Sequence, residues 1–418
     1  MRCLGRHLNV ALLEAAAMFG AYGQQKTLTW QDAKRELQSA NPTLRAGQIA
    51  VEESRANEIT AFLRPNPDLT VSVDQLNPFT GNPYQPFTDT LPLISGSYLH
   101  ERQHKRELRR QSARESTVIA ISQLADQERT LLFDLRNAFV QVLQQKAVVT
   151  IARENLEYYD RVLAVSSERF NVGDIAQVDF DRLELQRVQF ESDLQTALVN
   201  LRTSKIRLLA LLDDRTPIDQ LDVTGPFDFT EIVTPLEEFR QIALANRPDL
   251  RAAMQAIDKA HTDHRLALAN GSTDPTFGWD IARDPPIPVF FGLNVTIPLR
   301  IFDRNQGEKE RTQLDIGRQQ RLLEAARIQV FSEVDSSYAA IQSNLTLLRL
   351  YRLRYLAQAS RVRETISFSY QHGGASLLDF LQAQQDYRGI QISYLNLVGA
   401  YMSAANQMNL AVGQEMIH

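Results

Sequence analysis

The sequence contains almost no cysteine, and its single Cys3 lies close to the N-terminus. Disulfide-stabilised secreted modules require several cysteine pairs, so that class is excluded. The chain has only 18 Gly and 16 Pro among 418 residues, too few for a collagen-like or low-complexity protein. Hydrophobic residues make up 44% of the sequence, which is more than an intrinsically disordered chain contains. We therefore expect an ordered protein that does not depend on crosslinks.

An excess of positive charge and long apolar runs are also absent. The 45 Lys and Arg against 50 Asp and Glu give a net charge of −5, which argues against a dedicated nucleic-acid-binding protein. The body of the chain has no apolar run of about 18 residues or more, so it predicts no transmembrane helix. No Gly-x-x-x-x-Gly-Lys-Ser/Thr loop is present for binding nucleotide phosphates.

Residues 1–23 have the pattern of a secretory signal peptide. Two arginines precede a mostly apolar stretch from Leu8 to Phe19, and small residues follow it. We expect cleavage after Gly23, which leaves a mature protein without cysteine; an amphipathic first helix or a displaced start site would also fit the pattern. Cys3 precedes the apolar stretch, so it does not have the position of a lipidated cysteine. Export without disulfides fits a bacterial envelope protein.

Several sequence landmarks occur twice, in the same order. Pro42, in Asn-Pro-Thr-Leu-Arg-Ala, has its counterpart in Pro248, in Asn-Arg-Pro-Asp-Leu-Arg-Ala. Gly173, at the end of Arg-Phe-Asn-Val-Gly, has its counterpart in Gly373, at the end of Tyr-Gln-His-Gly. The spacing is nearly constant, which indicates an internal duplication. The predicted organisation is a first repeat at 24–213, a connecting segment at 214–234 and a second repeat at 235–418.

Each repeat contains one pair of strands, predicted at about 67–100 and 274–300. Apolar residues alternate with polar ones in both pairs, a period of two that is typical of a strand with one apolar face. Gly- and Pro-rich turns at 77–83 and 284–288 separate the two strands of each pair. The apolar positions include Leu69, Val71 and Val73 in the first pair and Phe277, Trp279 and Ile281 in the second. The chain is thus expected to contain only four strands.

A long helical stretch follows each strand pair. Residues 101–170 contain no Pro or Gly, and residues 308–370 contain only Gly317. At about 1.5 Å per residue, roughly 70 residues extend about 105 Å. The apolar spacing in the first stretch is coiled-coil-like and restarts past Val149, which predicts a local phase shift. Gly173 and Gly373 are expected to end these helices, and a helix of about 40 residues returns from each.

Four amphipathic strands cannot close a barrel, and a sheet with an apolar outer face has open edges. Three copies would supply twelve strands, an even number that can close in a membrane with the apolar residues facing lipid. The predicted fold is therefore mainly α-helical, with β-strands that lie in a membrane. Long antiparallel helical hairpins would form an α-barrel, and four strands per protomer would contribute to a trimeric twelve-stranded β-barrel.

These features resemble the TolC-type outer-membrane efflux protein family, and in particular its heavy-metal and drug efflux members. The resemblance is carried by the Asn-Pro-x-Leu and Arg-Pro-x-Leu openings, the strand pairs, the Arg-Phe-Asn-Val-Gly turn at 169–173 and the Leu-Leu-Asp-Phe-Leu-x-Ala-Gln run at 377–384. It covers nearly the whole mature chain. It implies a homotrimeric duct in outer-membrane lipid that extends into the periplasm, and passive export of substrates such as metal ions or drugs. The implied partners are a periplasmic adaptor and an inner-membrane pump of the resistance-nodulation-division type. No catalysis, cofactor or resident metal is implied.

The resemblance also assigns functional residues at the two helix turns, 171–175 and 371–375. The implied adaptor-docking tips are Val172, Gly173, Asp174, His372, Gly373 and Gly374. The implied tunnel entrance or gate contains Asp179, Tyr370 and Asp379, and a trimer would form a ring of three Asp379 carboxylates that favours cations.

Two departures from the family pattern are visible. The arginine of the family's gate network would lie at Ala375. Metal-export members of the family often have Gly-Lys-Arg after the second strand, where this chain has His104-Lys105-Arg106. The aspartates of the two tips are expected to differ: Asp174 caps the returning helix, and Asp379 faces the tunnel. His372 is expected to be polar surface rather than a metal ligand.

One motif favours an enzyme instead. His100-Glu101-Arg102-Gln103-His104 satisfies H-E-x-x-H, which on a helix binds zinc and activates water. Several basic residues follow it, and the third metal ligand of metzincins is missing, so we expect the match to be coincidental. The basic cluster itself lies either near anionic lipid or on a solvated helix face. A type I protein-secretion duct and a soluble coiled-coil scaffold are the two further functions that these sequence patterns allow.

Overall fold

The computed structural model describes residues 26–76, 79, 83–84, 86–87, 90–231, 234–284 and 287–417. The predicted signal peptide and most of the turn predicted at 77–83 lie outside these residues. The chain divides into two compact units. Unit 1 contains the described residues up to Arg45, Gln127–Arg247 and the residues from Gln329 onward, and unit 2 contains Ala46–Asp126 and Pro248–Ile328. No helix of the described part is both long and apolar enough to cross a membrane.

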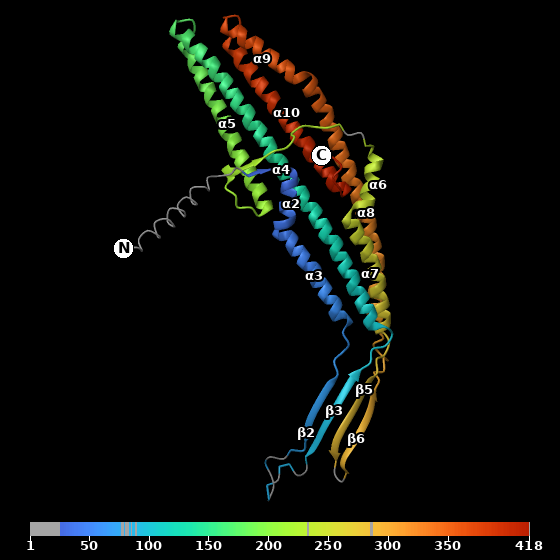
Figure 1. The fold of residues 1–418 in the computed structure, drawn as a ribbon. Coiled ribbons are helices and arrows are strands. Elements are labelled where there is room, and N and C mark those ends of the chain that lie inside the picture. The colour runs from blue at the N-terminus through green and yellow to red at the C-terminus, as the bar shows by residue number, and fades with distance from the viewer. Residues whose placement is uncertain are drawn as a thin grey trace, which may run out of the picture. The chain divides into compact units, whose positions relative to one another are not determined.

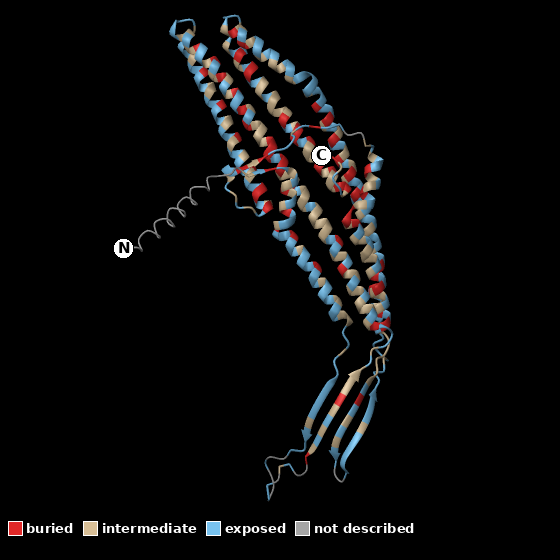
Figure 2. Cartoon of the chain, viewed as in Figure 1, coloured by how far each residue is buried: buried red, intermediate tan, exposed pale blue. Residues whose placement is uncertain are grey.

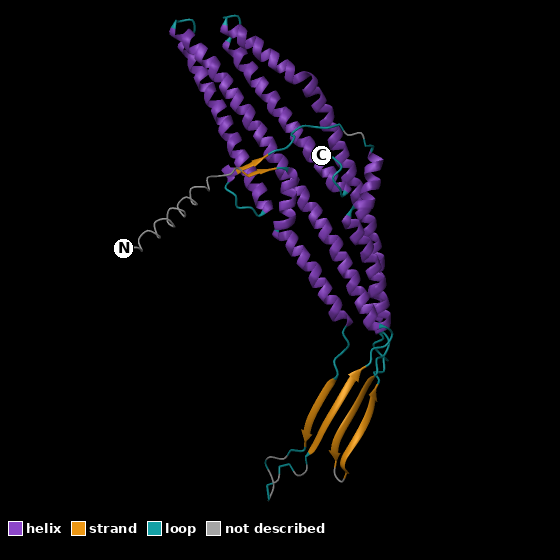
Figure 3. Ribbon diagram, viewed as in Figure 1, coloured by secondary structure: helices purple, strands orange, loops and turns teal. Residues whose placement is uncertain are grey.

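Unit 2 contains a four-stranded antiparallel sheet (Figures 1 and 3). Its strands are β2 (Asp68–Asp74), β3 (Leu91–Leu99), β5 (Thr276–Asp284) and β6 (Ile287–Thr296), in the order β2-β3-β5-β6. The two predicted strand pairs are confirmed, and β3 pairs with β5 to join them. As a result β2 and β6 are the edges of the sheet, each paired on one side only.

The alternating apolar residues share one exposed face of this sheet. Val71 lies opposite Ile94, Ile94 opposite Ile281, and Ile281 opposite Phe291, so the face continues across all four strands. Figure 2 shows most of the sheet as exposed, and Leu293 on β6 is 78% exposed. The large Trp279 side chain lies over Gly96, where an added Cβ would be 2.7 Å from the indole. A larger residue at position 96 would therefore force the indole to move.

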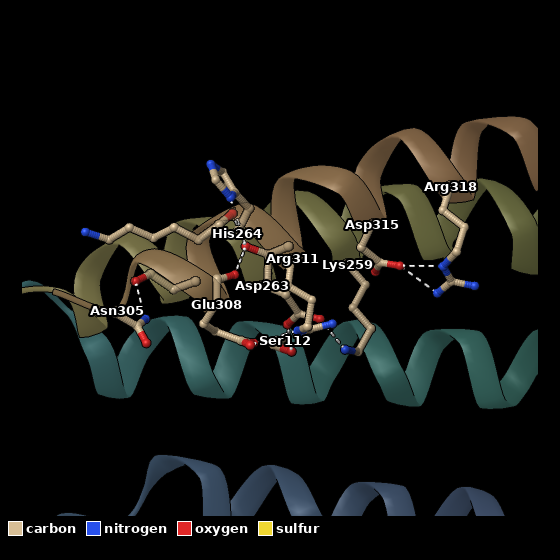
Figure 4. Close-up of polar contacts among 12 residues, drawn as sticks. Ser112, Lys259, Asp263, His264, Asn305, Glu308, Arg311, Asp315 and Arg318 are labelled. Carbon is tan, nitrogen blue, oxygen red and sulfur yellow. Dashed lines mark hydrogen bonds and ion pairs between the residues drawn. The ribbon is translucent and has the colours of Figure 1, made fainter. Parts of the chain in front are cut away.

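The helices of unit 2 come from α3 (Pro42–Phe62), α4 (Lys105–Asn171), α7 (Pro248–Asn270) and α8 (Gln306–Leu350). Polar side chains join them to one another (Figure 4). Ser112 of α4 donates to Asp263 of α7, and the Nδ1 atom of His264 lies 3.0 Å from the Oγ1 atom of Thr312 on α8. These contacts specify which helix faces meet, since each partly buried polar group needs a partner.

Unit 1 combines helices with a small parallel sheet that was not predicted from the sequence. β1 (Lys26–Leu28) pairs with β4 (Leu221–Val223), so the described residues contain six strands instead of the four expected. Three-residue strands are too short to show alternation. Around them lies an apolar core that includes Leu37, Leu135 and Leu212. The remaining elements are α2 (Trp30–Ala40), α5 (Gln177–Leu212), η1 (Ile218–Gln220), α6 (Leu236–Asn246), η2 (Tyr351–Tyr355), α9 (Leu356–Gln371) and α10 (Leu377–Val412).

The duplicated Pro motifs mark the helix boundaries α2/α3 and α6/α7. Asn41 caps α3 by accepting the Leu44 N–H at 3.1 Å, and Pro42 and Pro248 occupy first helical positions, where no N–H donor is needed. The long helices were predicted to within a few residues. α4 is one continuous α-helix, so the phase shift predicted in its apolar pattern past Val149 involves no break in the helix. A helical irregularity does occur in the second repeat, where the π-helical η2 separates α8 from α9.

Candidate functional site at the helix tips

Both long helical hairpins of unit 1 turn at a glycine in the left-handed conformation (Figure 1). Gly173 has φ 84° and donates to Phe170 O at 3.0 Å, while Asp174 donates to Arg169 O at 2.9 Å. Gly373 has φ 74° and donates to Tyr370 O at 3.1 Å, while Gly374 donates to Ser369 O at 2.7 Å. The two turns thus close the carbonyl ends of α4 and α9 in the same way.

The side chains at the two turns are either exposed or in contact with residues of the same turn. Val172 is 75% exposed at the first turn. At the second, the Nδ1 atom of His372 lies 2.8 Å from Phe368 O, and its ring lies against the Phe368 ring with centroids 4.1 Å apart. No group of three or more His, Cys, Asp or Glu side chains that could hold a metal occurs in the part of the chain the structure describes.

The starts of the two returning helices differ. Ser376 caps α10 and forms a capping box with Asp379, whose carboxylate accepts the Ser376 N–H at 3.2 Å and the hydroxyl at 2.6 Å. At α5 the N-cap is Ala176, which makes no side-chain cap. The expectation that Asp174 caps α5 is therefore wrong. Its carboxylate instead lies 4.0 Å from Arg169 Nε, because Asp174 stands two residues too early for the N-cap.

The three residues predicted for the entrance lie in different surroundings. Asp379 is exposed, and the hydrogen bonds from Ser376 hold the pKa of its carboxyl below the usual range. Asp179 lies 3.8 Å from Arg182 one turn further along α5. Tyr370 is only 6% exposed, and burial raises the pKa of its phenol. Among the described residues, no hydrogen bond or ion pair joins any two of these three side chains.

Tyr370 belongs to a column of aromatic rings that joins the two hairpins. It stacks on Phe380 of α10 at 4.9 Å, and Phe380 lies 6.2 Å from Tyr159 of α4, which stacks on Phe190 of α5 at 4.7 Å. Tyr159 also donates to Leu183 O at 3.0 Å, which ties α4 to α5. The rings form a buried core just below the two turns.

Arg169 is a further connection between the hairpins, and no role for it was predicted from the sequence. Its Nη1 atom donates to Tyr370 O at 3.0 Å, and its guanidinium carbon lies 5.8 Å from the centre of the Tyr370 ring. Ala375, where the family network has an arginine, packs beside the aromatic core instead. An arginine from the first hairpin thus contacts the second tip. The one sequence signal for it was its place in the Arg-Phe-Asn-Val-Gly motif.

The H-E-x-x-H motif lies in the loop between β3 and α4 in unit 2. Because α4 begins only at Lys105, the two histidines are not one helical turn apart on one face. His104 is 87% exposed, and the Glu101 carboxylate is bonded to Arg109. Gln103 and His104 both have positive φ values, 59° and 56°. The loop therefore does not present the zinc-binding geometry that the motif requires.

Comparisons with known proteins are consistent with this architecture. Residues 288–414 match the family model described as Outer membrane efflux protein. The chain is 22% identical over 388 residues to the cobalt-zinc-cadmium resistance protein CzcC of Cupriavidus metallidurans, which covers 93% of this chain and 90% of that protein. It is 24% identical over 330 residues to the pyoverdine export outer membrane protein OpmQ of Pseudomonas aeruginosa, covering 77% of this chain and 69% of that protein.

A solved structure of CusC has the same fold. It superposes with a TM-score of 0.78 and 18% identity, over 94% of this chain and 93% of that chain. The match spans both units. A likeness at this level of identity establishes the arrangement of strands and helices.

Proposed function

We propose that this chain, which belongs to the outer membrane efflux protein family, acts as the exit duct of a tripartite efflux system. It is an outer-membrane protein that extends into the periplasm. The duct conducts substrates passively from a periplasmic adaptor and an inner-membrane pump to the exterior.

The observation that carries this proposal is the sheet of unit 2. Its apolar face is exposed, and its edge strands β2 and β6 are each paired on one side only. A free sheet of this kind is unstable in water and open to association, because both its apolar face and its edges lack partners. Three copies supply twelve strands, and pairing of β6 of one copy with β2 of the next closes a barrel whose apolar residues face lipid. The protein therefore functions as a homotrimer.

The tips of unit 1 are the surfaces we propose for adaptor docking. Besides Val172, the exposed apolar residues there include Val178, Phe368 and Leu378. They lie within five residues of Gly173 or Gly373 in the sequence, and the bare backbones of these glycines allow close approach of another chain. Apolar side chains that are exposed on this protein alone would be covered in the complex.

The entrance of the duct lies beside these tips in our proposal. Asp379 is exposed and ionised at neutral pH, so three copies would place three carboxylates around the axis and favour cations. Tyr370 and Arg169 hold the two hairpins together near this point. Asp179 adds a further, partly exposed carboxylate at the start of α5, beside Arg182.

In this proposal the pump determines which substrates are exported. The two relatives serve a metal resistance system and a pyoverdine export system, so channels of this family conduct chemically different cargo. We propose metal ions or drugs as cargo, supplied by a pump of the resistance-nodulation-division type. The chain contributes no catalysis in this proposal, because the proteins that it resembles are channels.

Membrane fractionation followed by bilayer recording tests the proposal. The mature protein is expected in the outer-membrane fraction as trimers that dissociate only on heating, and the purified trimer is expected to conduct ions across a planar bilayer. Recovery of monomeric protein in the soluble fraction would favour the coiled-coil scaffold. Trimers in the membrane that restore secretion of a protein substrate but no efflux would favour the type I secretion duct.

A further inference from the structure

Unit 2 contains a basic cavity of about 510 Å³ between the sheet and the first turn of α4. Its lining includes Arg64 from the α3–β2 connection, Tyr98 at the end of β3, Arg102 and His104 in the following loop, and Arg106 in α4. This volume lies within the range of ligand sites, about 300–1,000 Å³. The cavity is separate from the helix tips, and the exit-duct function assigns it no role.

The charges in this cavity are not balanced. Glu101 is bonded to Arg109, and Glu107 accepts a hydrogen bond from Arg106 at 3.0 Å, so both carboxylates are engaged. Arg64 and Arg102 have no side-chain partner among the described residues. Two guanidinium groups with free donors next to a cavity form a ready site for an anion. Guanidinium can bind phosphate with two parallel, charge-assisted hydrogen bonds, which are stronger than hydrogen bonds between neutral groups.

The loop that carries Arg102 is held firmly in place. Asp274 accepts the Arg102 N–H at 2.9 Å and the ammonium of Lys105 at 2.6 Å, and the Lys105 side chain is almost fully buried. Gln103 and His104 adopt left-handed backbone conformations, which are unfavourable for residues other than glycine. Such conformations persist where the surroundings impose them, and they gather at ligand clamps. The cavity wall is thus prearranged before a ligand arrives.

We infer that this cavity binds the phosphate group of an anionic phospholipid from the periplasmic leaflet of the outer membrane. The inference rests on the proposed function, because it requires the sheet to lie in the bilayer. Apolar surface borders the cavity: Leu63 next to Arg64 is exposed, and Phe277 opposite Tyr98 is half exposed. A phospholipid matches both parts, with its phosphate on the arginines and its acyl chains on the sheet. Free inorganic phosphate would contact only the arginines.

Lipid titration of the purified full-length protein tests the inference. Wild-type protein in detergent is titrated with phosphatidylglycerol, phosphatidylcholine or inorganic phosphate, and the retained ligand is counted by native mass spectrometry. The test variant is Arg64→Gln/Arg102→Gln. The matched control is Arg321→Gln/Arg327→Gln, which removes two exposed arginines from α8 of the same unit. Each arginine near an anionic membrane surface contributes roughly 1 kcal/mol of binding free energy. The test variant should therefore bind phosphatidylglycerol about thirtyfold more weakly than wild type, and the control variant should bind it as tightly as wild type does.

Three results would overturn the inference. The first is equal retention of phosphatidylglycerol by the test variant and wild type, and the second is equal retention of phosphatidylcholine and phosphatidylglycerol by wild type. The third is inorganic phosphate that binds as tightly as the lipid, which would make the cavity a site for soluble phosphate. If trimers conduct normally while one of these results is found, only the lipid site fails. If wild type never reaches the outer membrane, the exit-duct function itself fails.

Discussion

At the scale of single residues, the tip glycines are the positions where the backbone alone dictates the side chain. Gly373 has φ 74°, a conformation that costs other residues about 1–2 kcal/mol, yet an added Cβ would touch nothing within 4 Å. We expect Gly373→Leu to abolish efflux by deforming the docking turn while trimers still reach the outer membrane. Drug or metal susceptibility and trimer abundance are measured together.

Gly389 in α10 supplies the matched control for this change. An added Cβ there also meets nothing within 4 Å, but the residue is helical and has no positive φ. Gly389→Leu should therefore leave both export and assembly intact. Normal export by Gly373→Leu would show that the turn conformation is not needed for coupling to the adaptor.

The two helix starts allow a reciprocal exchange of caps. Ser376 caps α10 with Asp379, whereas Ala176 leaves α5 without a side-chain cap although Asp179 stands three residues further on. Ser376→Ala should destabilise the start of α10 by about 1 kcal/mol, and Ala176→Ser should create a capping box and stabilise α5 by up to about 1 kcal/mol. Hydrogen exchange of the amides in the first turns measures both effects. Unchanged protection in Ala176→Ser would mean that Asp179 prefers Arg182.

The capping box of α10 should also respond to pH. Hydrogen bonds from Ser376 lower the pKa of the Asp379 carboxyl. The ionised carboxylate therefore stabilises the start of α10 to its full extent above the ordinary carboxyl pKa of about 4. The contribution is lost as the pH falls through the lowered pKa. Protection of the first turn of α10 should be constant from pH 7 to about 5 and then decline below about 4. In Ser376→Ala this decline should be smaller, and an equal decline would place the titrating group elsewhere.

At the scale of elements, the aromatic column is the buried apolar contact between the two hairpins near their tips. Phe380 is fully buried between Tyr370 and Tyr159, while Phe368 on α9 is 64% exposed. Phe380→Ala should lower the stability of the tip region by about 3–5 kcal/mol, the usual effect of truncating a buried phenylalanine. Phe368→Ala should change it by less than about 0.5 kcal/mol. Limited proteolysis near the tips compares the two, and similar cleavage rates would contradict the role of the column.

The sequence predicted the elements well where a pattern extended over many residues. Alternation identified β2, β3, β5 and β6, and the scarcity of Pro and Gly identified α4 and α8 with α9. It did not predict β1 and β4, because three residues carry no period. Nor did it predict that Ser376 and Asp379 form a capping box on α10 while Asp174 does not cap α5, since capping depends on where each helix begins to within one residue. Arg169 was missed because its partner is a backbone carbonyl, which has no sequence signature.

At the scale of the whole molecule, the sheet explains how a chain with many charged residues can be a membrane protein. Its apolar residues occupy alternate positions, so no continuous apolar segment is needed and the average hydropathy stays low. Neighbouring residues of one strand therefore lie on opposite faces of the sheet, and only one of the two faces needs apolar side chains. Leu293 belongs to the exposed apolar face and lies opposite Trp279, whereas Asn294 lies opposite Gly278 on the other face.

This alternation gives a test of the assembly within two adjacent residues. Leu293→Lys should impair outer-membrane insertion, because a lysine facing the middle of the bilayer costs about 2–4 kcal/mol in each of three copies. Asn294→Lys adds the same charge to the same strand, but on the face that would line the channel beside Gly278, so trimers should still form. The heat-modifiable trimer in outer-membrane fractions is measured for both variants. Equal trimer yields would mean that the apolar face of β6 does not contact lipid, whereas loss of trimer in Asn294→Lys alone would reverse the two faces of the barrel.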